Sequence, residues 1–286
     1  MPEEALAKNS NTPVEINAKM HAEATKILVE QGKIIEPNTL VLGFGKTGLS
    51  LGGSIPICYN SYKVLLSASH VAECFETTEQ VRTLYKCDPI TRYYPPKNCA
   101  DFHIEKWDPN FDSKMLEKEI LSTKPKDLAV ITPAKCIDEI TSHKTFYHLP
   151  TEKTAIPENL SSLALITIGC IEACNKDNVV EGMSTVLGVI SSDYHEFSDC
   201  DYIVCTVDTN TYEIRQLGKK RISSFRGLSG NGLWAITNGK PQLIGVAIAE
   251  DLTGYNTIGK GTIWFHGPKS IYAALQSWEQ NHNLKS

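Results

Sequence analysis

Short apolar runs separated by turn residues are the feature that most constrains the fold of this 286-residue chain. Most of the runs contain several β-branched side chains, and clusters of turn residues lie between them. Runs of this kind are typical of β-strands, and their recurrence along the chain favours antiparallel sheets. The runs cover residues 39–43, 62–68, 127–132, 164–169, 185–190, 202–207, 243–249 and 262–265.

Helical patterns occur only near the two ends of the chain. Thr12 and Glu15 form a capping box around Pro13, and the apolar stripe that follows continues to Gly32, so the sequence predicts a helix over this segment. The stripe consists of Ile16, Met20, Ala24, Ile27 and Leu28. A C-terminal helix is predicted after Pro268, with an apolar face made of Ile271, Leu275 and Trp278.

Residues 225–234 read Phe-Arg-Gly-Leu-Ser-Gly-Asn-Gly-Leu-Trp and place Ser229 between two glycines, just before an apolar strand. A tight turn of this kind can display a serine hydroxyl beside backbone N–H groups that stabilise an oxyanion. A serine hydroxyl is a poor nucleophile by itself. The chemistry therefore requires a histidine base and a carboxylate from elsewhere in the chain.

Both partners have candidates in the first half of the sequence. His70 follows the apolar run at 62–68, and Asp127 opens the run at 127–132, so each is expected at the end of a buried strand. Taken separately, each residue has an ordinary structural explanation, as a strand-end histidine bonded to a carbonyl, a cap, or a serine in a turn. The order His70, Asp127, Ser229 gives the three together a more specific meaning.

Taken together, these motifs resemble those of the chymotrypsin/trypsin-like serine proteases. The matching stretches are Leu-Ser-Ala-Ser-His-Val around His70, Asp-Leu-Ala-Val from Asp127 and Gly-Leu-Ser-Gly-Asn around Ser229. The resemblance covers roughly residues 38–283 and implies an all-β protein of two packed six-stranded antiparallel β-barrels. It divides the chain into an N-terminal helical extension (1–37), a first barrel (38–135), an inter-barrel linker (136–160), and a second barrel with a C-terminal helix (161–286).

The resemblance implies a serine endopeptidase that acts on protein or peptide substrates without a cofactor or metal. His70 would take the proton of Ser229, Asp127 would orient the imidazole, and the N–H groups of Gly227 and Ser229 would form the oxyanion hole. For the substrate pocket, it implies Ser223 at the base, with Ile248, Glu250 and Gly261 along the walls. A neutral base favours an uncharged side chain before the scissile bond, although Glu250 could instead attract a lysine or arginine.

Three positions depart from the family pattern. Leu228 stands where trypsin-like enzymes carry the aspartate that pairs with a new N-terminal amine, and no Ile-Val-Gly-Gly start is present, so activation by that zymogen switch is excluded. Asn231 replaces a glycine, and Ile248 replaces a serine that often supports the buried aspartate. The oxyanion hole is then either preformed, as in bacterial relatives of the high-temperature-requirement type, or ordered by a partner or substrate.

Two alternatives to a peptidase stay open, the first favoured by these departures and the second permitted by the triad chemistry. One is a catalytically inactive trypsin-like domain that binds peptides or proteins. The other is an esterase, but the α/β-hydrolase elbow needs Gly-x-Ser-x-Gly, and Asn231 breaks that pattern. The N-terminal helix is expected either to cover one end of a barrel or to dock a regulatory protein.

Composition bears on compartment and partners. The first residues lack the basic start and apolar core of a signal peptide, and no apolar stretch reaches the length of a membrane span, so we expect a cytoplasmic protein. Nine cysteines, an odd number that includes neither of the family's bridges around the catalytic residues, favour reduced thiols. A net charge of −5 argues against nucleic acid as the main partner.

Overall fold

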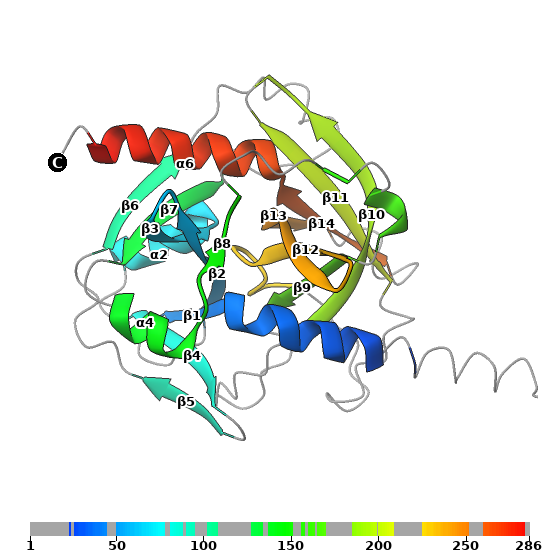
Figure 1. Cartoon of the computed structure of the whole chain (residues 1–286), viewed down its shortest axis with the longest axis horizontal. Coiled ribbons are helices and arrows are strands. Elements are labelled where there is room, and N and C mark those ends of the chain that lie inside the picture. The colour runs from blue at the N-terminus through cyan, green and yellow to red at the C-terminus, as the bar shows by residue number, and fades with distance from the viewer. Residues whose placement is uncertain are drawn as a thin grey trace, which may run out of the picture.

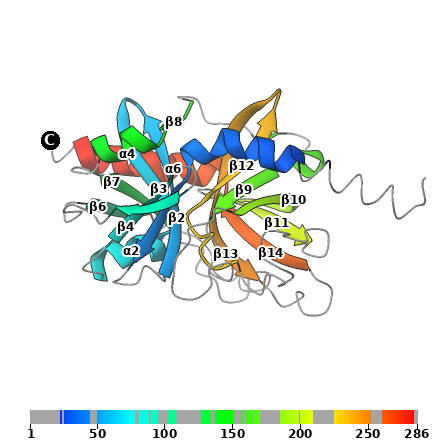
Figure 2. The ribbon, with the colours of Figure 1, turned by 90° about the horizontal axis from the view of Figure 1, so that it is seen from below.

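The computed structural model contains two β bodies that lie side by side and are bridged by a C-terminal helix (Figures 1 and 2). Most of the regular structure described between the terminal helices is strand, in agreement with the mostly β prediction. The structure describes residues 23, 26–44, 50–77, 81–87, 90–94, 102–107, 127–133, 137–150, 156–157, 160–163, 165–169, 185–198, 200–208, 225–251 and 260–283.

The first body is an eight-stranded sheet with the order β5-β4-β1-β2-β3-β7-β6, in which the short β8 pairs in parallel with β2. Among the described strands, β5 and β6 are its two edges, so a closed first barrel stays a prediction. Its strands are β1 (Leu40–Phe44), β2 (Ser50–Tyr59), β3 (Tyr62–Ser67), β4 (Val81–Cys87), β5 (Ile90–Tyr94), β6 (Phe102–Trp107), β7 (Leu128–Pro133) and β8 (Tyr147–His148).

The second body is a closed six-stranded antiparallel barrel with the order β10-β11-β14-β13-β12-β9, as the sequence predicted for this half. Bulges interrupt the pairing of β10 with β11, of β12 with β13, and of β13 with β14. Such bulges increase the local bend that a small barrel requires. Its strands are β9 (Leu165–Gly169), β10 (Thr185–Glu196), β11 (Asp201–Asp208), β12 (Gly232–Thr237), β13 (Lys240–Asp251) and β14 (Lys260–His266).

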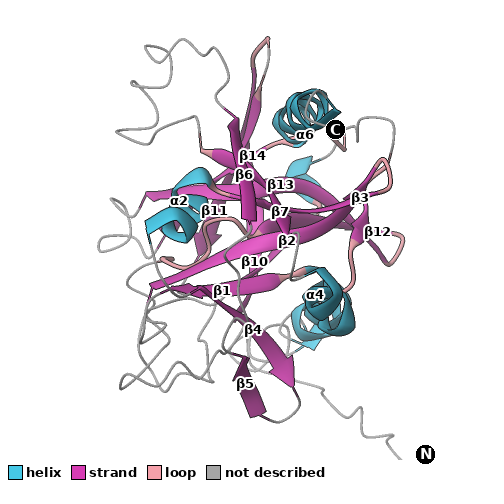
Figure 3. Ribbon diagram, turned by 90° about the vertical axis from the view of Figure 1, so that its left-hand side faces the viewer, coloured by secondary structure: helices cyan, strands magenta, loops and turns pink. Residues whose placement is uncertain are grey.

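Two short internal helices correct the expectation that only the chain ends are helical. They are α2 (Ser69–Thr77) and α4 (Ile137–His143), and Figure 3 shows both at the periphery of the strands. Each is at most about two and a half turns long, too short to carry a recognisable helical period. α4 and β8 both fall within segment 136–160, which we predicted to be a linker.

The N-terminal helix ends later than predicted. Residues 26–35 are helical, and a 3-10 turn, η1 (Glu36–Asn38), follows, so the helix passes through Gly32 and stops just before Pro37. The predicted start at Thr12 lies outside the described residues. The C-terminal end of this helix is fixed by the buried Lys144, whose Nζ lies 2.7 Å from the Glu36 carboxylate.

The two bodies share their apolar cores. One buried cluster joins Leu65 and Ile131 of the sheet to Tyr202 and Trp264 of the barrel. A second cluster joins strands of both bodies to α6 (Pro268–Asn283), and a third lies within the barrel itself. Because side chains from both bodies complete the same clusters, the two bodies are held in one relative position.

A buried carboxylate anchors the N-terminus of α6. Asp201 accepts hydrogen bonds from the backbone N–H of Ser270 at 2.8 Å and of Lys269 at 3.2 Å, and from the Tyr194 hydroxyl at 3.2 Å. Burial raises the pKa of Asp201 above its ordinary value, while the donors from Ser270 and Lys269 act in the opposite direction. A carboxylate at this end of a helix satisfies N–H groups that have no partner inside the helix.

Replacing Asp201 by alanine is expected to lower the free energy of unfolding by about 3 kcal/mol, because it strands buried N–H groups at the start of α6. Urea denaturation at pH 7 measures the change. Asp193→Ala, which removes an exposed carboxylate from the neighbouring strand β10, is the matched control and should shift stability by less than about 0.5 kcal/mol. Equal effects of the two substitutions would contradict the anchoring role.

Candidate active site

His70 and Asp127 are brought together by the pairing of β3 with β7. These strands are antiparallel, with Ser67 opposite Ala129, so the end of β3 lies beside the start of β7. His70 stands in the first turn of α2, directly after β3, and Asp127 directly precedes β7. The sequence positions that suggested strand ends therefore become neighbours in space.

The Asp127 carboxylate holds His70 at two points. One oxygen accepts the His70 backbone N–H at 2.8 Å, and the other contacts His70 Nδ1 in a short hydrogen bond. The Asp127 side chain is 12% exposed, whereas that of His70 is 48% exposed. A largely buried carboxylate thus fixes one ring nitrogen of an imidazole that remains open to solvent on another side.

Ser229 lies in a tight loop that directly precedes β12 (Gly232–Thr237). Gly227 and Gly230 have φ values of 95° and 84°, a conformation that favours glycine on either side of the serine. The N–H of Leu228 donates to the Phe225 carbonyl at 3.0 Å and closes the turn. These glycines are therefore required by the backbone that displays Ser229.

The Ser229 loop is bonded to both bodies. Gly53 of β2 donates its N–H to the Ser229 carbonyl at 2.8 Å, and Gly230 donates to Ala247 of β13 at 2.7 Å. The Gly53 carbonyl in turn accepts the Ser67 hydroxyl at 2.7 Å, near the end of the strand that leads into His70. A Cβ at Gly230 would lie 2.0 Å from the Gly53 carbonyl oxygen, so only glycine allows this approach.

This bonding places the serine loop of the barrel against the strands that carry the His70–Asp127 pair. Among the described residues, no hydrogen bond joins the Ser229 hydroxyl to His70. In enzymes without substrate, such contacts are often long and shorten when substrate binds.

Two backbone N–H groups of the loop have no acceptor among the described residues, those of Gly227 and Ser229. The N–H groups of Leu228, Gly230 and Asn231 each donate to a carbonyl. The N–H groups of Gly227 and Ser229, two residues apart, are therefore available to donate hydrogen bonds to an oxygen atom of a bound molecule. This is the arrangement that an oxyanion hole needs.

Of the four residues predicted for the substrate pocket, the structure describes three. Ser223 lies outside the described residues. Glu250 is part of β13, and its carboxylate accepts the Phe225 N–H in a short hydrogen bond. Ile248 is buried in the cluster between the bodies, at a bulge in β13, and Gly261 pairs with Val207. Their contact with substrate stays a prediction.

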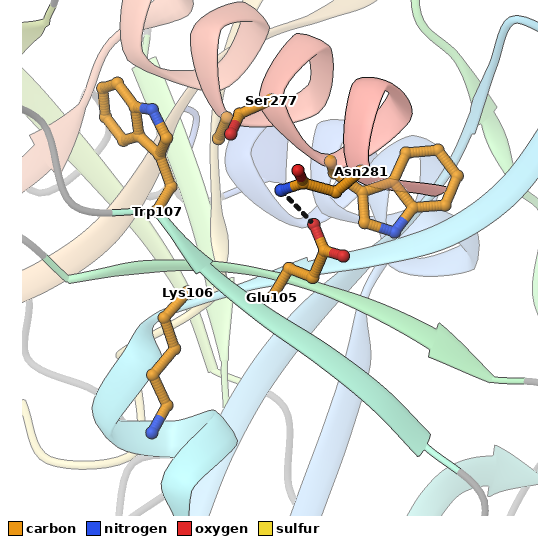
Figure 4. Close-up of a pocket in the computed structure, with 7 residues that line it drawn as sticks. Glu105, Lys106, Trp107, Ser277 and Asn281 are labelled. Atoms are coloured by element: carbon orange, nitrogen blue, oxygen red, sulfur yellow. Dashed lines mark hydrogen bonds between the residues drawn. The ribbon is translucent and has the colours of Figure 1, made fainter. Parts of the chain in front are cut away.

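A cavity of about 220 Å³ lies elsewhere, between β6 and α6 (Figure 4). Its lining includes none of the candidate catalytic residues, and Glu105 accepts a hydrogen bond from Asn281 at 3.3 Å across it. In Figure 4 the Lys106 side chain points away from Asn281. Lys106 Nζ lies 3.6 Å from the Glu73 carboxylate on α2. The cavity is a separate feature of the surface.

Metal-binding clusters and membrane-spanning helices are both absent from the described part of the chain. No group of three or more histidine, cysteine, aspartate or glutamate side chains is placed there to hold a metal ion. None of its helices is both long and apolar enough to cross a membrane. Cys58, Cys74 and Cys205 are free thiols, and burial raises the pKa of Cys205 above its ordinary value.

Comparisons with known proteins give matches only among solved structures. No family model matches the sequence, and no curated protein matches it. The chain is similar to an HtrA-type protease AlgW with tripeptide, at 17% identity and a TM-score of 0.46 over 88% of this chain. It spans 62% of that AlgW chain, less than two thirds of its length.

Two further matches have lower identity. The serine endoprotease from Yersinia pestis is 13% identical with a TM-score of 0.43, over 87% of this chain and 65% of the other. Deg5 is 12% identical with a TM-score of 0.45, over 79% of this chain and 86% of the other.

Proposed function

We propose that this chain is a serine endopeptidase that cleaves peptide bonds through His70, Asp127 and Ser229. The proposal rests on the two hydrogen bonds that join the largely buried Asp127 carboxylate to the backbone N–H and Nδ1 of an accessible His70. A carboxylate in this position fixes the proton on Nδ1 and leaves Nε2 free to act as a base. The serine loop supplies the third member from the neighbouring barrel.

The first chemical step joins Ser229 to the substrate. As the hydroxyl oxygen attacks the peptide carbonyl carbon, its proton passes to Nε2 of His70, and the carbonyl oxygen becomes an oxyanion. The N–H groups of Gly227 and Ser229 stabilise this charge, and Asp127 stabilises the imidazolium. Collapse of the intermediate breaks the C–N bond, and His70 gives its proton to the departing amine.

The second step releases the acyl group. Water attacks the ester carbonyl while His70 takes one of its protons, and a second tetrahedral intermediate forms in the same oxyanion hole. Its collapse returns the proton to Ser229 and frees the carboxylic acid. No group other than those of the chain and water is needed for the cycle.

Covalent labelling with a fluorophosphonate tests this proposal without knowledge of the natural substrate. The expected result is a single adduct by intact mass, mapped to Ser229 by peptide analysis and absent from Ser229→Ala. Ser142→Ala, which changes an exposed serine on α4, is the control and should label like the wild type.

The alternative is a peptide-binding module that uses the same surface without catalysis. The observation that favours it is the lack of a hydrogen bond from the Ser229 hydroxyl to His70 among the described residues. A folded wild-type protein that forms no adduct, yet binds peptides from a library, would support this alternative and exclude the peptidase.

A further inference from the structure

Asn231 is fully buried directly after the serine loop, and its side chain is bonded to the backbone of that loop. Its Nδ2 donates to the carbonyl of Leu228 at 2.9 Å and to that of Gly227 at 3.1 Å. Its backbone N–H also donates to the Leu228 carbonyl at 2.9 Å. One amide therefore restrains two consecutive peptide groups next to the proposed nucleophile.

The restraint on the Leu228 carbonyl also orients the Ser229 N–H. A peptide group is planar and trans, so its carbonyl and the following N–H point in opposite directions within one plane. Two donors from Asn231 hold the Leu228 carbonyl inward. The Ser229 N–H, at the other end of that plane, is thereby turned away from Asn231.

Glycines of both bodies make room for the Asn231 side chain. A Cβ at Gly53 of β2 would lie 2.2 Å from the Asn231 amide atoms, and a Cβ at Gly169 of β9 would lie 2.7 Å from Nδ2. The backbone on the other side is also fixed, because Ala247 of β13 donates to the Asn231 carbonyl at 2.8 Å. The amide thus occupies a fitted site at the junction of sheet and barrel.

From these contacts we infer that Asn231 is a positioning residue that preforms the oxyanion hole. The inference rests on the proposed peptidase function. In this chain the amide does internally what an aspartate at position 228 and a new N-terminus would do after cleavage of a zymogen, a device that Leu228 excludes. Donors that are fixed before the reaction stabilise the oxyanion without reorganisation. The hole then needs no proteolytic activation.

The test measures fluorophosphonate labelling as a function of reagent concentration, which separates reversible binding from the rate of bond formation. Asn231→Ala removes the amide, and Asn231→Asp keeps its shape but loses the donor. For both variants we expect the maximal labelling rate to fall by about 10²-fold with little change in reversible binding. A merely structural role would lower the amount of folded protein and leave this rate unchanged.

Asn38→Ala is the matched control, because Asn38 is also a buried asparagine whose Nδ2 bonds a backbone carbonyl, that of Thr145 at 2.8 Å. It should label at the wild-type rate. Wild-type labelling rates in folded Asn231→Ala or Asn231→Asp would overturn the inference while leaving the peptidase proposal intact. Absence of labelling in the wild type would overturn both.

A second measurement covers the case in which both variants fail to fold. In the wild-type protein the side-chain amide protons of Asn231, observed by NMR, are expected to be strongly protected from hydrogen exchange. Exchange at the rate of an exposed amide would mean that the two carbonyl bonds are not held, and would overturn the inference.

Discussion

Replacing His70 by alanine is expected to lower turnover of a peptide substrate by about 10⁶-fold, because the Ser229 proton then has no acceptor and the leaving amine has no donor. His70 is nearly half exposed, so its removal leaves no cavity in the apolar core. Turnover by the wild type and by His70→Ala is compared on one peptide substrate, which is first selected from a library by using the wild-type protein. Near-ultraviolet circular dichroism verifies that the variant is folded.

His148→Ala is the control for this experiment. His148 is an exposed histidine on β8, outside the serine loop and the strands that carry the His70–Asp127 pair, so the variant should keep wild-type turnover. If the His70→Ala protein retained a tenth of wild-type turnover, His70 would be excluded as the base.

Replacing Asp127 by asparagine is expected to lower turnover by about 10⁴-fold while preserving the shape of the site. The new amide donates to Nδ1 of His70, which places the imidazole proton on Nε2 and removes the acceptor that Ser229 needs. The ring nitrogens of His70 report this change directly by ¹⁵N NMR. The wild type should carry the proton on Nδ1, and the variant on Nε2.

A second aspartate–histidine pair provides the control for the Asp127 variant. Asp193 lies 3.4 Å from Nε2 of His195 and is 61% exposed. Asp193→Asn should therefore leave turnover and the His70 tautomer unchanged. Turnover of Asp127→Asn within tenfold of the wild type would show that the carboxylate does not orient the base.

The strands that could be predicted from the sequence are those in which a local run of apolar residues indicates burial. All eight predicted runs overlap strands, because apolar residues, many of them β-branched, dominate these runs and become buried. Strand β2 was missed because Gly52, Gly53 and Pro56 interrupt its pattern. Those residues serve long-range contacts: a Cβ at Gly52 would meet Val71, and one at Gly53 would meet Asn231.

The candidate site was predictable only in part. His70, Asp127 and Ser229 stand out because each terminates or interrupts an apolar run, and the structure brings the first two together. Gly53 and Ser67 were missed: the Gly53 N–H bonds to Ser229 far along the chain, and the Ser67 hydroxyl bonds to the Gly53 carbonyl across the sheet. Asn231 was interpreted as a departure from the family, because sequence alone does not show which carbonyls a buried amide will meet.

Helix α6 has a consequence for how this protein unfolds. Its first turn is fixed by Asp201 of the barrel, while Trp278 further along packs in a cluster that includes Leu66 and Val130 of the sheet. Figure 1 shows the helix running across both bodies. Opening of either end therefore exposes core belonging to both, so sheet and barrel should melt in a single cooperative transition. The proposed catalytic site, which is divided between the two bodies, should therefore be lost together with the fold rather than before it.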